Sequence, residues 1–133
     1  MRRILFVCHG NACRSVMVEA IARDKFGTTV EVASVGLYPQ QAGDSQMALE
    51  TLSAYFNLDA SNHVPRSITE VDGNTFDYVV AMDPKIAKQL PNLQDGKVII
   101  WEIDDPWGDD AEEYLKCAKS INKEVSKIAF TLR

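Results

Sequence analysis

A cysteine and an arginine stand six positions apart in the segment VCHGNACRS (residues 7–15), with a glycine and an asparagine between them. The segment starts where an apolar run ends and leads into a helical pattern, so backbone N–H groups and the helix dipole favour an anion there. Gly10 and Asn11 tolerate the positive φ angles that turn successive N–H groups inward. Arg14 adds a fork of donors that can hold two oxygens of a phosphate. The loop therefore predicts a cradle for an oxyanion with three or more oxygens.

Cys8 lies in these positive surroundings, which favour the thiolate form of its side chain and make it a nucleophile. An anion cradle around a nucleophilic sulfur predicts phosphoryl transfer onto sulfur. The alternative is that Cys8 is a small buried residue and Arg14 a surface residue, but the C-x5-R spacing with a helix behind it favours function. A metal site built from Cys8, His9 and Cys13 is disfavoured, because the spacing is not C-x2-C and the chain has no second ligand pair.

A second segment, EIDDPWGDD (102–110), contains candidates for the proton donor that phosphate-ester cleavage needs. It follows the last expected strand and so belongs at the same edge of the sheet as the cysteine loop. Asp105 precedes Pro106, whose ring restricts both residues, and Asp104 is an alternative acid. Trp107 can stack on an aromatic leaving group. Aspartates in such a pattern also form turns and cap helices, so both interpretations stand at this point.

Strand and helix patterns alternate along the chain and position these segments. Apolar runs predict strands at 3–7, 30–35, 77–82 and 97–101. Helical spacing of apolar residues predicts helices at 15–26, 48–56, 84–90 and 114–128. We expect Gly27 to end the first helix, Asp44 or Ser45 to cap the second, and Asp109 or Asp110 to cap the last. The prediction is one α/β domain over residues 1–133, a three-layer sandwich with a central four-stranded parallel sheet and helices on both faces. Ligands of such sheets bind beyond the C-terminal ends of the strands, where the Cys8 loop lies.

The composition narrows the class of protein. A chain of 133 residues with 46% hydrophobic and 25% charged residues is typical of one globular domain. It contains no apolar stretch of membrane-spanning length and no secretory signal, so we expect a cytoplasmic location. The net charge of −5 argues against nucleic acid or a membrane as partner. Three cysteines do not make a disulfide framework and fit a reducing compartment.

The loop VCHGNACRS, together with the late DDP (104–106), resembles the low-molecular-weight protein tyrosine phosphatases and the arsenate reductases that share their fold. Other segments are similar to the family in the same order: ASVG (33–36), SNHVPRSIT (61–69) and FDYVVAMD (76–83). The resemblance therefore covers nearly the whole chain.

This resemblance implies a protein tyrosine phosphatase reaction with a phosphocysteine intermediate. Cys8 would attack phosphorus, while Arg14 and the N–H groups of residues 9–14 would hold the phosphoryl oxygens. Asp105 would protonate the leaving phenol and then activate water. No metal or organic cofactor is implied. The implied partners are a phosphotyrosine-containing protein, for example a bacterial tyrosine kinase, and inorganic phosphate as product and inhibitor.

The same resemblance assigns supporting roles around the loop. Ser15 would hydrogen-bond the Cys8 sulfur, and Cys13 would trap an oxidised Cys8 as a reversible disulfide. Asn11 would hold the loop in shape, with Ser34 and His63 as its partners. The implied phosphate- and substrate-binding set is His9, Gly10, Asn11, Ala12, Cys13, Ser15 and Trp107. Residues such as Ser34 and His63 more commonly satisfy local backbone, and Cys117 is expected to be a core residue.

Several positions depart from the family pattern and leave alternatives open. Val16 stands where phosphatases usually have Pro and many reductases have Gln. Asp83 matches a family aspartate, but Pro84 and Ile86 break the polar pattern that commonly follows, which leaves its role in the site open. Trp107 replaces the usual Tyr or Phe.

Three functions compete on this sequence. The first is a phosphatase acting on phosphotyrosine. The second is an arsenate reductase, whose arseno-cysteine must be resolved by another thiol. Thioredoxin-linked reductases carry a cysteine pair after the third strand, whereas AMDPKIAKQLP (81–91) contains none, so an external small thiol with its redoxin would be required. The third is a non-catalytic module that binds phosphate or a phosphoprotein. The combination of Cys8, Arg14 and Asp105 favours the phosphatase.

Overall fold

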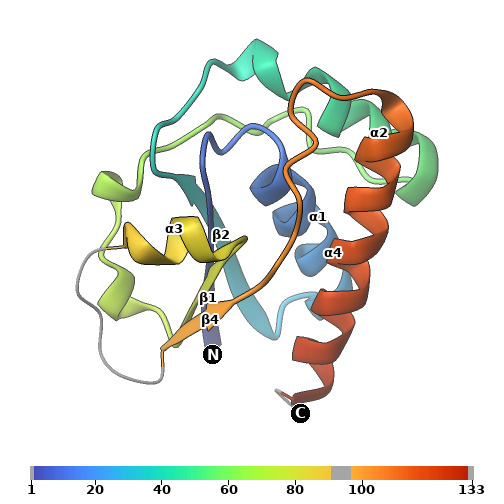
Figure 1. The fold of residues 1–133 in the computed structure, drawn as a ribbon. Coiled ribbons are helices and arrows are strands. Elements are labelled where there is room, and N and C mark those ends of the chain that lie inside the picture. Colours follow the sequence, from blue (N-terminus) through green and yellow to red (C-terminus); the bar gives the residue numbers. More distant parts are fainter. Residues whose placement is uncertain (1, 91–96, 132–133) are drawn as a thin grey trace.

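A four-stranded, all-parallel sheet forms the centre of the computed structural model, which describes residues 2–90 and 97–131 (Figure 1). The strands are β1 (Arg2–Cys8), β2 (Val30–Gly36), β3 (Tyr78–Ala81) and β4 (Val98–Ile100), in the order β2-β1-β3-β4. The four residues from Ile4 to Val7 are fully buried, because β1 lies inside the sheet and is covered on both faces. The parallel α/β fold predicted from the alternation of patterns is confirmed.

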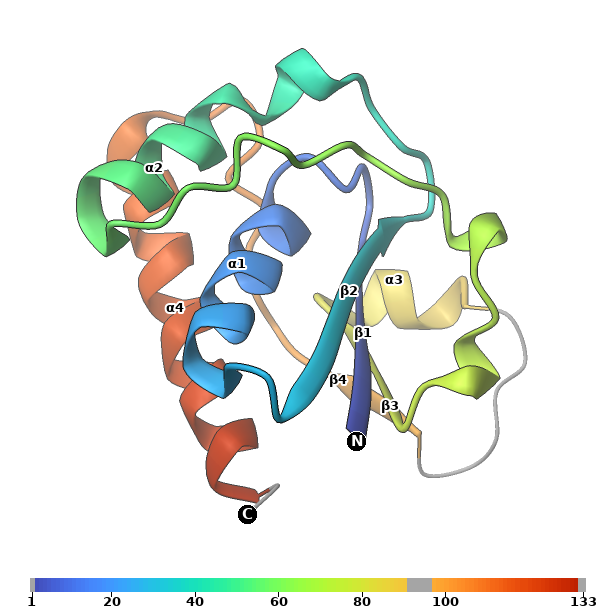
Figure 2. The same ribbon diagram turned by 180° about the vertical axis from the view of Figure 1, so that it is seen from behind.

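Helices cover both faces of this sheet. The α-helices are α1 (Arg14–Phe26), α2 (Gln46–Phe56), α3 (Pro84–Lys88) and α4 (Ala111–Thr131), and three short 3-10 helices lie at Ala42–Ser45, Ile68–Glu70 and Gly73–Thr75. Helices α1 and α4 pack together on one face, with α2 across one end of the pair, and α3 lies on the other face (Figures 1 and 2). None of the helices in the described part of the chain is long and apolar enough to cross a membrane.

The ends of the helices agree only in part with the sequence prediction. Gly27 ends α1 with a φ of 60° and donates its N–H to Arg23. The side chain of Asp110 accepts the N–H of Glu113 and caps α4, as expected. The helix begins at Ala111, three residues before the apolar stripe that starts at Tyr114. The expected side-chain cap of α2 is wrong: Ser45 occupies the position but accepts no cap hydrogen bond, because the neighbouring aspartate closes a separate 3-10 turn.

The carboxyl ends of the strands meet at one edge and continue there as an extended ladder. Cys8 at the end of β1 lies opposite Gly36 at the end of β2. Beyond β3 and β4, Met82 donates its N–H to Val7 and Ile103 donates to Met82. This ladder brings the segment after β4 to the edge where the cysteine loop begins.

Candidate active site

The Cys8 sulfur lies at the centre of a loop between β1 and α1. It is 2% exposed, lies 2.8 Å from Ser15 Oγ, and accepts the N–H of Asn11 at 3.2 Å. Because Ser15 Oγ also accepts a hydrogen bond from Asn11 Nδ2 at 2.7 Å, its own O–H is available to donate to the sulfur. Two donors are therefore placed to stabilise negative charge on the Cys8 sulfur.

Asn11 holds the loop in its conformation. It is fully buried and has a φ of 52°, as the sequence predicts for this residue type. Besides Ser15, its side chain donates to Ser34 Oγ at 3.0 Å and accepts the N–H of Arg66 at 2.8 Å. Its carbonyl lies 2.7 Å from His63 Nε2, and since a carbonyl can only accept, His63 donates. The structure thus brings Asn11, Ser34 and His63 together as expected.

Two glycines near the loop differ in how closely other atoms approach them. Gly10 does not have the positive φ that the sequence suggested. A Cβ on Gly10 would lie 2.9 Å from side-chain carbons of Gln40, and this flexible side chain can move to make room. A Cβ on Gly36 would lie 2.7 Å from the backbone nitrogen of Asn11, so only glycine fits there. Sequence reasoning assigned no role to Gly36, although its place at the end of the second strand was a usable signal.

Arg14 is a buried cation with a fixed orientation. It is 3% exposed, and its Nη1 donates to Asp83 Oδ2 at 2.7 Å and to the Ile103 carbonyl at 2.8 Å. Burial alone would lower the pKa of Arg14, but the hydrogen bond to Asp83 and the charge of Asp105 raise it above its ordinary value. Burial alone would raise the pKa of Asp83, but the hydrogen bond from Arg14 lowers it. Asp83 therefore belongs to the site, which the sequence had left open.

Asp105, rather than Asp104, faces the cysteine. Asp105 lines the same small pocket as Cys8 and Arg14, with its Oδ2 3.6 Å from Arg14 Nη2. Its Oδ1 accepts the N–H of Trp107 at 3.0 Å, which orients the carboxylate. Asp104 does not line this pocket but a neighbouring cavity.

Aromatic and polar side chains surround the mouth of this pocket. Trp107 lines it and is 47% exposed, and Gln40 lines it as well. The His9 ring lies 5.2 Å from the Tyr38 ring, and the Tyr38 hydroxyl donates to Gln89 at 3.2 Å. His9, Gly10, Ala12 and Cys13 complete the lining. Tyr38 and Gln89 were missed, because they come from segments that carry no motif.

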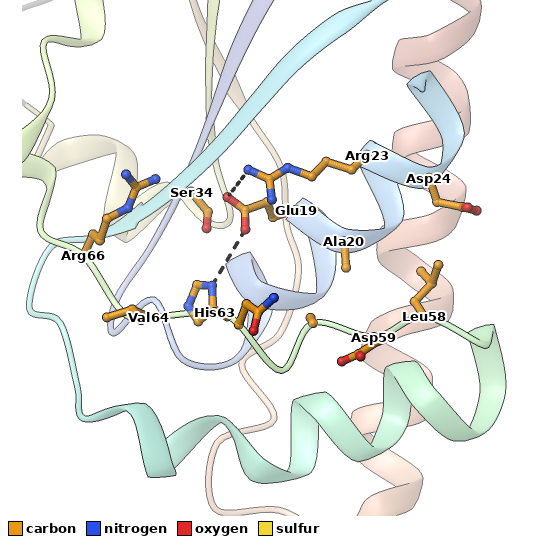
Figure 3. Close-up of a pocket in the computed structure, with 12 residues that line it drawn as sticks. Glu19, Ala20, Arg23, Asp24, Ser34, Leu58, Asp59, His63, Val64 and Arg66 are labelled. Carbon is orange, nitrogen blue, oxygen red and sulfur yellow. Dashed lines mark hydrogen bonds and ion pairs between the residues drawn. The ribbon is translucent and has the colours of Figure 1, made fainter. Parts of the chain in front are cut away.

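A larger cavity of about 700 Å³ lies behind the loop (Figure 3). His63, whose side chain is 6% exposed, points its Nδ1 toward Glu19 at 3.7 Å, and Glu19 also pairs with Arg23 at 3.4 Å. The Ser34 hydroxyl points into the same space (Figure 3). Ser34 and His63 thus connect this cavity to Asn11. Glu19 was not predicted from the sequence, because a glutamate within a helix carries no distinguishing signal.

The other two cysteines are buried, Cys13 at the end of the loop and Cys117 in α4, and burial keeps both as neutral thiols. Burial raises the pKa of Cys13 far above its ordinary value, although a hydrogen bond with Tyr114 opposes this. Burial likewise raises the pKa of Cys117 to about 12, and this residue packs in the core as expected. All three cysteines are free, so the disulfide between Cys8 and Cys13 stays a prediction. Within residues 2–90 and 97–131, no group of His, Cys, Asp or Glu side chains could hold a metal ion.

The fold and this loop define a class of α/β proteins in which a buried cysteine lies at the centre of an oxyanion-binding turn. The family model for low molecular weight phosphotyrosine protein phosphatases matches residues 3–133. The chain belongs to this family, which includes phosphatases and arsenate reductases.

The proteins that this chain resembles are named for three different activities: arsenate reductase, tyrosine phosphatase and arginine phosphatase. Arsenate reductase 1 of Staphylococcus haemolyticus is 29% identical over 132 residues, covering 98% of this chain and 97% of the relative. The structure of a low molecular weight protein tyrosine phosphatase from T. tengcongensis is 28% identical, with a TM-score of 0.88, and the match covers 98% of this chain and 99% of that one. An arginine phosphatase from Geobacillus stearothermophilus is 26% identical with a TM-score of 0.85, covering 99% and 93% of the two chains.

Proposed function

We propose that the protein is a phosphatase that hydrolyses phosphotyrosine and other aryl phosphate monoesters through a phosphocysteine on Cys8. The observation that carries this proposal is one pocket lined by Cys8, Arg14 and Asp105. These side chains supply a nucleophile, a buried cation and a carboxyl group, the three functions that transfer of a phosphoryl group from an aryl ester requires.

In the first step, the Cys8 thiolate attacks phosphorus and the bond from phosphorus to the phenolic oxygen breaks. Asp105, in its protonated form, gives its proton to that oxygen, so the leaving group departs as a neutral phenol. Arg14 cannot rotate freely because Nη1 is held by Asp83 and the Ile103 carbonyl. Its remaining donors and the backbone N–H groups of the loop then bind the phosphoryl oxygens.

In the second step, Asp105 is a carboxylate and takes a proton from water as the water oxygen attacks phosphorus. The phosphorus–sulfur bond breaks, inorganic phosphate forms, and the Cys8 thiolate is restored. The hydroxyl of Ser15, 2.8 Å from the sulfur, stabilises this leaving thiolate. The proton that Asp105 gives to the phenol in the first step is therefore replaced from water in the second.

The half-exposed ring of Trp107 beside this pocket supports an aromatic leaving group. A phosphotyrosine-containing protein, for example a tyrosine kinase, is therefore the substrate that we propose, with inorganic phosphate as product and competitive inhibitor.

Arsenate reduction is the second candidate, because the curated relatives at 27–29% identity are named arsenate reductases. The arseno-cysteine on Cys8 would then need a second thiol. The segment after β3 has no cysteine, and burial raises the pKa values of Cys13 and Cys117, which disfavours their nucleophilic forms. A small external thiol such as glutathione or mycothiol, with its redoxin, would have to resolve the adduct.

Hydrolysis of p-nitrophenyl phosphate tests the phosphatase proposal, with thiol-dependent arsenite formation measured in parallel. We expect phosphate release by the wild type and none by Cys8→Ser, which should still bind phosphate. Turnover by Cys8→Ser would refute the nucleophile. Arsenite formation without phosphate release would replace the phosphatase by the reductase, and phosphate binding without either reaction would indicate a non-catalytic module.

The assignment of the acid is tested with aryl phosphates of increasing leaving-group pKa. Asp105→Asn should slow the poor leaving groups far more than the good ones, because only the poor ones need the proton. Asp104→Asn is the matched control, and it should not show this dependence. The reverse result for the two variants would move the acid to Asp104.

A further inference from the structure

The side chain of Gln40 lies over the glycine of the cysteine loop. The backbone N–H of Gln40 donates to the carbonyl of Gly10 at 2.9 Å, which anchors its main chain beside the loop. Its side chain passes across Gly10, because a Cβ on that glycine would lie 2.9 Å from Cγ and Cδ of Gln40 and 3.3 Å from Nε2. The lack of a side chain at position 10 therefore leaves the space in which the Gln40 amide lies.

The amide of Gln40 is available to a molecule that binds in the nucleophile pocket. Gln40 lines this pocket together with Cys8, Arg14 and Asp105. The residue is partly buried, and within residues 2–90 and 97–131 its side-chain amide forms no hydrogen bond. A primary amide offers one oxygen acceptor and two N–H donors. Since the protein itself does not satisfy these atoms, a ligand in the pocket can.

The size of the pocket and the chemistry of its walls limit what this amide can do. The pocket has a volume of about 40 Å³, room for only a few water molecules, so a group on its wall contacts whatever occupies it. Arg14 and the backbone N–H groups are donors, which bind the phosphoryl oxygens. Of the described residues that line the pocket, only Asp105 and Gln40 carry a side-chain oxygen that can act as an acceptor. An attacking water molecule has two hydrogens and can use both acceptors.

We propose that Gln40 is a further catalytic residue, which positions the attacking water when the phosphocysteine is hydrolysed. The inference rests on the proposed phosphatase function, because the water must attack a phosphoryl group on Cys8. Once the phenol has left, the water takes its place beside Asp105. Oε1 of Gln40 accepts a hydrogen bond from the water, while Asp105 removes the other hydrogen as a proton. The water oxygen bonds to phosphorus, the electron pair of the phosphorus–sulfur bond returns to sulfur, and Gln40 is unchanged.

This role belongs to the second step of the reaction only. In the first step, the phenolic oxygen needs the proton of Asp105 rather than an acceptor, and no water takes part. Loss of the amide should therefore slow the breakdown of the phosphocysteine and leave its formation unchanged. A residue that only held the loop in shape would slow both steps, because the same N–H groups stabilise the transition states of both.

Rapid mixing with p-nitrophenyl phosphate tests the inference, because the release of p-nitrophenol and the release of phosphate can be followed separately. Gln40→Met keeps a side chain of similar length over Gly10 but removes the amide. We expect its rate constant for phosphate release to fall by about three- to tenfold, the factor that one hydrogen bond supplies. The rate constant for p-nitrophenol release in the first turnover should stay at the wild-type value. Acid quenching during turnover should then show a larger fraction of enzyme with phosphate on Cys8.

Gln46→Met is the matched control for this substitution. Gln46 is an exposed residue of α2 and does not line the pocket, so the same chemical change there should leave both rate constants as in the wild type. A loss in Gln46→Met equal to that in Gln40→Met would overturn the inference, because the effect would then not depend on the pocket.

The outcomes also separate this inference from the phosphatase proposal. If the wild type turns over but Gln40→Met slows both steps equally, or slows neither, the role of Gln40 is overturned and the phosphatase proposal stands. If neither the wild type nor Gln46→Met releases p-nitrophenol or phosphate, the phosphatase proposal fails, and the role of Gln40 fails with it.

Discussion

Substitution of Asn11 should destabilise the protein and disrupt the phosphate cradle, because this side chain holds the loop in its conformation. Its side chain makes three hydrogen bonds, to Ser15, Ser34 and the Arg66 N–H, and it is fully buried. Each such bond contributes about 0.5–1.5 kcal/mol, and partners left unsatisfied add to the loss. Alanine at a φ of 52° costs about 1 kcal/mol more. Asn11→Ala should therefore lower the free energy of unfolding by about 3–5 kcal/mol.

A second variant separates the two contributions. Asn11→Gly loses the same hydrogen bonds but adopts the positive φ without strain, so it should be about 1 kcal/mol more stable than Asn11→Ala. Urea unfolding with a common m-value measures both differences. Hydrolysis of p-nitrophenyl phosphate, assayed well below the unfolding midpoint, should fall strongly in both variants, because the Asn11 backbone N–H that contacts Cys8 is no longer held.

The reasoning would be refuted by an Asn11→Ala protein within about 1 kcal/mol of wild type, since that is less than one lost buried hydrogen bond with its unsatisfied partner. Equal stability of the Ala and Gly variants would show that the backbone conformation carries no cost. Normal turnover by either variant would show that the loop holds its shape without this side chain.

Three further substitutions test other contacts of the site. Gly36→Ala should weaken inhibition by phosphate, because its Cβ would lie 2.7 Å from the Asn11 nitrogen; an unchanged inhibition constant would contradict this. Asp83→Asn should be destabilising at neutral pH, because it removes the charge that pairs with Arg14. The lowered pKa of Asp83 means that its contribution is complete above the unfolded value of about 3.9 and is lost as pH falls through the folded value, so urea unfolding should show the variants converging in acid. Trp107→Ala should raise KM severalfold for aryl phosphates but not for alkyl phosphates, which steady-state kinetics can decide.

The sheet and the main helices were predictable from the sequence because each carries its own periodic signal. The buried run before Cys8 and the stripe that ends at Ile128 need only local pattern and chain alternation to be placed. The irregular chain from 57 to 77 has no such period. His63 and Arg66 in this segment form hydrogen bonds with Asn11, which lies about fifty positions earlier in the sequence. Only the family resemblance indicated the contact of His63, and nothing indicated that of Arg66.

Asp83 shows a limit of comparing patterns of residues. Pro84 and Ile86 depart from the family pattern, and for that reason the sequence left the role of Asp83 open. In the structure, both follow from local chemistry: Asp83 caps α3 by accepting the Ile86 N–H, and Pro84 occupies the first turn, where its missing N–H is not needed. The cap orients one carboxylate oxygen, which leaves the other to bind Arg14.

The choice between the two aspartates of DDP could have been made from the sequence. Side chains along an extended segment alternate in direction, with a period of two residues. Trp101 and Ile103 are apolar and both are buried, while Glu102 between them is exposed. Because Ile103 continues the ladder of hydrogen bonds past the end of β4, the same alternation directs Asp104 away from the loop and Asp105 toward it. The alternation in WEIDD therefore favours Asp105 as the residue that faces Cys8, by the same physical rule that predicted the sheet.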